Sequence, residues 1–131
     1  MTARLTRLKT RAEFLRVAGT RVRAARPGLV LQAAPRTSEP EGELRVGYTA
    51  SRRVGNAVVR NRAKRRLRAA AASVLPRHGK TGMDYVLIAR EGTGKRLYAA
   101  LLADLEGALR QLARPQPARP PSVRQPRGGE G

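Results

Sequence analysis

The residues whose types and spacing best fit a chemical task are the cations between Arg52 and Arg68. This segment holds eight Lys and Arg residues and neither Asp nor Glu. Ordinary solvent-exposed faces mix both signs of charge, so that neighbouring side chains pair rather than repel. Here Arg60, Lys64 and Arg68 follow one another at four-residue spacing, and each like-charged pair costs an isolated helix about 0.2 to 0.5 kcal/mol. Phosphate groups would neutralise this repulsion, so the segment indicates a nucleic-acid-binding face.

The composition of the whole chain agrees with a polyanionic partner. The 131 residues include 28 Lys and Arg against nine Asp and Glu, which gives a net charge of +19. Such a charge repels itself unless a polyanion compensates it. The chain has no Cys, which excludes disulfide scaffolds and thiolate metal sites, and its single histidine, His78, argues against a histidine-based metal centre. We therefore expect a cytoplasmic protein without a metal site of its own.

Candidate catalytic motifs fail on their spacing. Residues 92–95 (GTGK) match part of a phosphate-binding loop, but the first glycine and the hydroxyl residue after the lysine are missing. Asp104 and Glu106 lie two residues apart on an expected helix, so they do not face each other as a catalytic pair. His78 has neither a Cys nor a serine elbow to serve. These observations argue against a hydrolytic centre carried by the protein itself.

Hydrophobic patterning places the cationic segment inside a small α/β domain. A capping box from Thr10 to Glu13 begins a helix that extends to about Gly19. Beyond it, the period of the apolar residues predicts strands at 29–34 and 44–50, a helix at 57–75, a strand at 84–90 and a helix at 95–113. This order predicts an α/β sandwich, with one small sheet covered mainly by helices. We expect residues 1–113 to form this single domain.

The expected helix at 57–75 sorts its side chains by type. At about 100° per residue, its apolar side chains fall within one arc, roughly opposite an arc of polar and cationic side chains. The apolar arc holds Val59, Ala63, Leu67, Ala70 and Val74, and the opposite arc holds Arg60, Asn61, Lys64, Arg65 and Arg68. Before the helix, Gly55 permits a tight turn and Asn56 fits the N-cap position, while Arg52 and Arg53 extend the cationic face.

The two ends of the chain differ from this domain. Residues 114–131 contain five prolines, three glycines and four arginines, so we expect a disordered tail. The first nine residues are basic and contain no apolar stretch of the signal-peptide type. Mitochondrial transit peptides share such an arginine-rich, acid-poor start, and the sequence leaves that alternative open.

The sequence from Arg53 to Arg68, RVGNAVVRNRAKRRLR, resembles the RNR signature of the bacterial ribonuclease P protein family. The similarity covers residues 4–113, in which the Glu13-Phe14 helix, the strand into Tyr48, the strand at 84–90 and the closing helix follow the family order. The resemblance implies an αβββαβα domain with one small mixed sheet and a left-handed βαβ crossover, against the usual right-handed preference. It also implies an RNA-binding subunit of an endoribonuclease, which helps a catalytic RNA remove the 5′ leader from precursor tRNA.

The resemblance also implies site residues. The residues that would contact the RNA subunit are Arg53, Arg60, Asn61, Arg62, Lys64, Arg65 and Arg68. We add Arg52 and Asn56 as candidates, because they lie directly beside these residues in the chain. Phe14 and Tyr48 are the candidate leader-binding residues, with the Phe14 ring as a stacking platform beside the exposed sheet face. The family commonly has further aromatic residues on this surface. This chain instead has Ala18 one turn after Phe14, and Gln32 or a neighbour in the strand at 29–34.

On this hypothesis the chemistry belongs to the RNA. We expect Mg²⁺ ions held by the RNA subunit, rather than by protein ligands, to position and activate the attacking water. The expected partners are ribonuclease P RNA and precursor tRNA, with no dedicated protein partner.

Other classes of protein could use the same cationic helix. A ribosomal or other structural RNA-binding protein is the main alternative. A DNA-binding protein would place the helix in the major groove, but no helix-turn-helix partner precedes it. Insertion into a membrane surface would be weak, because the apolar arc is rich in Ala and lacks aromatic residues.

Overall fold

The computed structural model describes residues 4–35 and 43–113, which form a five-stranded sheet with three helices. Across the sheet the strands lie in the order β1–β4–β5–β3–β2. Their bounds are β1 Arg4–Arg7, β2 Arg23–Arg26, β3 Leu29–Pro35, β4 Glu43–Thr49 and β5 Met83–Ala89. The helices are α1 Arg11–Gly19, α2 Ala57–His78 and α3 Tyr98–Ala113, and a short 3-10 turn at Arg52–Val54 precedes α2.

The sheet mixes parallel and antiparallel pairs. Strand β4 is parallel to both β1 and β5, whereas β3 is antiparallel to β5 and to β2. Adjacent parallel strands need a crossover, and α2 provides it between β4 and β5. This is the connection for which the resemblance implies the left-handed sense. Helices α2 and α3 pack against each other on one face of the sheet, and α1 lies on the opposite, outer face.

The main core lies between the sheet and the α2–α3 layer. Alternate residues of the central strands face this layer, among them Leu44 and Val46 of β4 and Leu87 of β5. Leu67 of α2 and Leu105 of α3 meet them, and all of these side chains are buried. The core is built from Leu, Val and Ala, with Tyr85 as its large aromatic residue, so its packing depends on close contact between small side chains.

The outer face carries a smaller apolar cluster under α1. Leu8, Val17, Ala34 and Val86 are buried there, and Phe14 packs against them. The Phe14 ring lies directly over Gly47 of β4, because a Cβ at that position would overlap two of its ring carbons. Val17 is the one residue of α1 that is fully withdrawn from solvent. Apolar burial therefore holds α1 only lightly.

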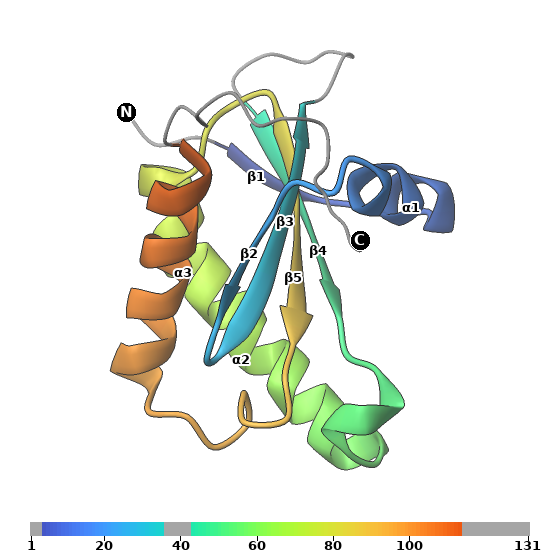
Figure 1. The fold of residues 1–131 in the computed structure, drawn as a ribbon, viewed down its shortest axis with the longest axis vertical. Helices are drawn as coiled ribbons and strands as arrows, with labels where there is room; N and C mark the ends of the chain where they lie inside the picture. Colours follow the sequence, from blue (N-terminus) through green and yellow to red (C-terminus); the bar gives the residue numbers. More distant parts are fainter. Residues whose placement is uncertain (1–3, 36–42, 114–131) are drawn as a thin grey trace, which may run out of the picture.

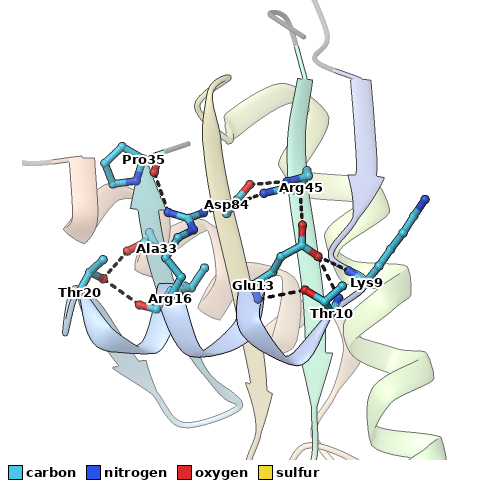
Figure 2. A network of polar contacts seen from close by, with 10 residues as sticks. Lys9, Thr10, Glu13, Arg16, Thr20, Ala33, Pro35, Arg45 and Asp84 are labelled. Atoms are coloured by element: carbon cyan, nitrogen blue, oxygen red, sulfur yellow. Dashed lines mark hydrogen bonds and ion pairs between the residues drawn. The ribbon is translucent and has the colours of Figure 1, made fainter. Parts of the chain in front are cut away.

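Polar contacts supply the remaining attachment of α1 (Figure 2). The capping box is present, since Thr10 Oγ1 accepts from Glu13 N and Glu13 Oε1 accepts from the backbone N–H groups of Lys9 and Thr10. The second Glu13 oxygen pairs with Arg45 of β4. Arg45 in turn donates from Nε and Nη2 to the fully buried carboxylate of Asp84 on β5, at 2.9 and 2.7 Å.

Further polar contacts fix the C-terminal half of α1. Arg16 pairs with the same Asp84 carboxylate and donates to the carbonyl of Pro35, 3.0 Å away. Just after the helix, the Thr20 hydroxyl donates to the carbonyl of Ala33 at 2.9 Å. Helix α1 is thus tied to β3, β4 and β5.

The predicted elements are confirmed, with shifts at their ends. Helix α2 continues through Pro76 to His78, three residues past the predicted end, and the Gly79 amide then donates to the Leu75 carbonyl. Helix α3 begins at Tyr98 rather than at residue 95. Residues 93–96 form a turn instead, in which Arg66 donates hydrogen bonds to the carbonyls of Thr93, Gly94 and Arg96. Strands β1 and β2 were not expected from the residue pattern. The expected tail at 114–131 lies outside the described residues.

Among the helices of residues 4–35 and 43–113, none is both long and apolar enough to span a membrane.

The pairing of Glu13 predicts how acid affects stability. Backbone N–H groups of Lys9 and Thr10, together with Arg45, lower the pKa of Glu13 from 4.5 to about 2. The contribution of its charged form to stability is therefore complete above pH 4.5 and is lost as the pH falls toward 2. Between these values, the unfolding free energy of the unmodified protein should fall more than that of Glu13→Gln, measured by denaturant titration. Equal losses would show that the Glu13 charge does not stabilise the fold.

Candidate nucleic-acid interface

The N-terminal half of α2 projects beyond the ends of the strands (Figure 1). Asn56 caps the helix, since its Oδ1 accepts from the Val59 amide at 3.0 Å. Gly55 adopts a φ of 150°, which a residue with a side chain rarely does, and a Cβ there would crowd Val59. The turn and the cap confirm the structural roles expected for these two residues. Together they fix where the cationic segment leaves the body of the sheet.

Most of the predicted cations are exposed to solvent. The exposed cations are Arg52, Arg53, Arg62, Arg65 and Arg68. The predicted asparagines Asn56 and Asn61 are exposed as well. In the part of the chain that the structure describes, no residue from Arg52 to Arg68 forms an ion pair with a carboxylate. We call Arg52, Arg53, Arg60, Asn61, Arg62, Lys64, Arg65 and Arg68 the α2 cationic surface. Its charges remain free to meet a polyanion.

Two members of this surface are less exposed than the helical projection predicts. Arg60 and Lys64 are half-buried, and the Arg60 Nε atom is shielded from solvent without a hydrogen-bond partner. Seven residues further on, at the same angle around the helix, Leu67 and Ala71 are fully buried. The prediction that Arg60 and Lys64 lie opposite the packed face was therefore wrong. The same side of α2 is cationic near its N-terminus and apolar where it crosses the sheet.

The predicted apolar arc of α2 is buried except for its first residue, Val59. Ala63, Leu67, Ala70 and Val74 are buried as expected. Val59 is 37% exposed, because it lies in the projecting part of the helix.

Arg66 lies within the cationic segment but faces the protein. It donates to the carbonyls of Thr93 and Gly94, at 3.1 and 2.9 Å, and to the carbonyl of Arg96. These bonds hold the turn between β5 and α3 against α2. Arg66 is therefore a structural residue, although its neighbour Arg65 is exposed.

The structure does not bring Phe14 and Tyr48 together. Phe14 lies on the outer face over Gly47, whereas Tyr48 packs against the main core on the opposite face. Alternation along β4 separates positions 47 and 48 in this way. Grouping both residues in one leader-binding surface was therefore wrong on geometry. Tyr48 instead belongs beside the α2 cationic surface.

Tyr48 supports one cation of that surface directly. The guanidinium carbon of Arg68 lies 5.6 Å from the centroid of the Tyr48 ring, within the range of a cation–π contact. Burial raises the pKa of the Tyr48 hydroxyl, and the nearby charges of Arg68 and Arg7 partly oppose this shift. Arg7 of β1 thus adds a cation at this edge of the surface.

Two cations that adjoin the surface, Arg7 and Lys95, could not be predicted from the sequence pattern. Lys95 lines the same hollow as Arg53 and Arg62, although it lies more than thirty residues further along the chain. Arg7 joins from the N-terminal strand. Neither cation lies within the periodic segment, so only the fold places them there.

Comparisons with known proteins identify the family. The family model described as Ribonuclease P matches residues 2–113. A protein of Paramagnetospirillum magneticum named Ribonuclease P protein component is 55% identical over 114 residues, covering 86% of each chain. A protein of Gluconacetobacter diazotrophicus with the same name is 50% identical over 112 residues, covering 85% of this chain and 94% of the other.

A solved structure agrees with these relatives. The RNase P protein of Staphylococcus aureus superposes with a TM-score of 0.68 at 25% identity, covering 82% of this chain and 94% of that one. The mixed sheet, the helices and the signature segment thus agree with the sequence relationship, and the ribosomal alternative is not favoured. The chain belongs to the bacterial ribonuclease P protein family, as an RNA-binding subunit of this tRNA-processing endoribonuclease.

Proposed function

We propose that the α2 cationic surface is where this protein docks on the ribonuclease P RNA. The observation that carries the proposal is the absence of carboxylate partners along this surface in the described residues. Guanidinium groups bind phosphates through paired N–H donors, and Asn61 adds a group that can contact a base edge or a sugar. The projection of α2 beyond the strands lets a large RNA approach it from several sides.

We further propose that the outer sheet face binds a part of the substrate, the single-stranded leader of precursor tRNA. Helix α1 covers this face only in part, and Gln32, Thr49 and Ile88 beside it stay half-buried. The Phe14 ring borders the uncovered area and offers a stacking surface to an unpaired base. The face lies on the opposite side of the sheet from α2, so one protein could hold RNA subunit and leader at the same time.

The chemical step is proposed to occur on the RNA, with Mg²⁺ bound by RNA phosphates. Three carboxylates in the part of the chain that the structure describes already stabilise the fold. Glu13 and Asp84 bind arginines under α1, and Asp104 binds Arg96 and the Gly28 amide. The protein would reduce the repulsion between two polyanions rather than ligate the metal. The cytoplasm, where precursor tRNA is matured in bacteria, is the proposed location.

Two neighbouring arginines provide a matched test of the docking surface. Arg65→Ala should weaken binding to the ribonuclease P RNA and make the dependence of log K on log salt shallower by about 0.7 to 0.9, because one phosphate contact is lost. The measurement is the affinity of the variant for the RNA over a series of salt concentrations. The melting temperature of the variant should equal that of the unmodified protein. An unchanged slope would remove Arg65 from the interface.

Arg66→Ala should behave in the opposite way. It leaves three carbonyls of the 93–96 turn without their donor, so the melting temperature should fall. At temperatures where the variant is folded, the salt slope should match that of the unmodified protein. A shallower slope would show that Arg66 reaches phosphate.

Reconstitution tests the division of labour between protein and RNA. The purified protein alone should not cleave precursor tRNA, whereas its addition to the cognate RNA at low Mg²⁺ should raise the cleavage rate. At high Mg²⁺ the gain should shrink, because the cations then screen the RNA themselves. Equal rates with and without the protein at low Mg²⁺ would contradict the proposed role.

A further inference from the structure

Two consecutive residues of α1 are fixed to two neighbouring positions of β4. Glu13 pairs with Arg45, and the ring of Phe14 lies over Gly47. Arg45 and Gly47 are two residues apart on the strand, so both present the outer face. The ion pair, which Figure 2 shows, and the ring contact over Gly47 are therefore neighbours on the same face of β4.

The donors of Arg45 are directed into the protein. Its Nε and Nη2 bind the two oxygens of Asp84, its Nη1 binds Glu13, and its side chain is 21% exposed. Asp84 is fully buried and also receives Arg16. Two carboxylates and two guanidinium groups thus form a compact network, in which each charge meets its opposite. Each of the three guanidinium nitrogens of Arg45 thus already has a carboxylate partner, and its charge is met by Asp84 and Glu13 rather than left for an RNA phosphate.

This network matters because α1 has few other attachments. Only Val17 of its nine residues is fully buried, so apolar packing alone would allow the helix to tilt. Glu13 prevents this at the N-terminal end, where one of its oxygens closes the helix cap and the other reaches the sheet. The residue that carries this anchor directly precedes Phe14 in the chain.

We propose that Glu13 and Arg45 are positioning residues for the leader of precursor tRNA: they hold the Phe14 ring at a fixed place on the outer face without contacting RNA themselves. The inference rests on the proposed role of that face in leader binding. It predicts that breaking the Glu13–Arg45 pair reduces affinity for the leader and that this effect requires the Phe14 ring.

The test uses the holoenzyme reconstituted with each variant and measures affinity for precursor tRNA and for mature tRNA, which lacks the leader. Glu13→Gln is the main variant, because glutamine preserves the capping-box acceptor but loses the charge that pairs with Arg45. It should weaken binding of precursor tRNA by about three- to tenfold and leave binding of mature tRNA unchanged. In a Phe14→Ala background, the same substitution should have no further effect on precursor affinity.

Two further variants separate position from stability. Glu106→Gln makes the same chemical change at an exposed i,i+4 pair with Arg110 on α3, and should leave both affinities unchanged. Gly47→Ala leaves the charged network in place but displaces the Phe14 ring directly, and should also weaken precursor binding selectively. Thermal melts of each variant set the assay temperature below unfolding, and Gly47→Ala supplies the test of ring position if Glu13→Gln does not fold.

The outcomes distinguish the inference from the proposed function. If Glu13→Gln and Phe14→Ala each weaken precursor binding and their effects simply add, the positioning role is overturned while the leader role of Phe14 stands. If Phe14→Ala has no effect on precursor affinity, the proposed leader role fails, and the inference falls with it. If Glu13→Gln weakens precursor and mature tRNA equally, Glu13 acts on the whole fold and the inference is wrong.

Discussion

Scarcity of negative charge is the constraint on which the rest of the structure depends. The chain has nine Asp and Glu residues for 28 Lys and Arg, so most cations cannot have a carboxylate of their own. The buried acids are used where an element needs attachment: Asp84 under α1, and Asp104 between the Gly28 amide and Arg96. None of these acids reaches the α2 cationic surface. Carboxylates thus hold Arg16, Arg45 and Arg96 to the fold, whereas the cations of the α2 cationic surface form no ion pair with a carboxylate in the described residues.

Helix α2 combines packing and binding by changing character along its length as well as around its axis. Arg60, Lys64 and Arg68 share their angular positions with Leu67, Ala71 and Leu75, each seven residues later. The later set is buried in the main core, whereas Arg60 and Lys64 are half-buried and Arg68 is exposed beside Tyr48. The two sets together extend from Arg60 to Leu75, and the 22 residues of α2 accommodate both.

The sequence allowed the long periodic elements, the capping box at Thr10 and the cationic segment to be predicted, because each depends on neighbours a few residues apart. Strands β1 and β2 escaped prediction because each has four residues and an arginine at both ends, too short a run for alternation to be visible. Arg65 and Arg66 look equivalent in the sequence, and only the carbonyls of a turn thirty residues away separate their roles. Tyr48 was assigned to the wrong face for a related reason. Alternation separates residues 47 and 48, but the sequence does not say which helix covers which side.

The three carbonyl bonds made by Arg66 have a consequence for the cost of association. They join α2 to the 93–96 turn, so that Lys95 is held beside Arg53 and Arg62 in the free protein. Cations on separate, loosely connected segments would each lose freedom of movement when an RNA brought them together. Here much of that ordering has already taken place during folding. The surface is preorganised, and in the proposed docking on RNA a larger share of each contact's energy would be available as affinity.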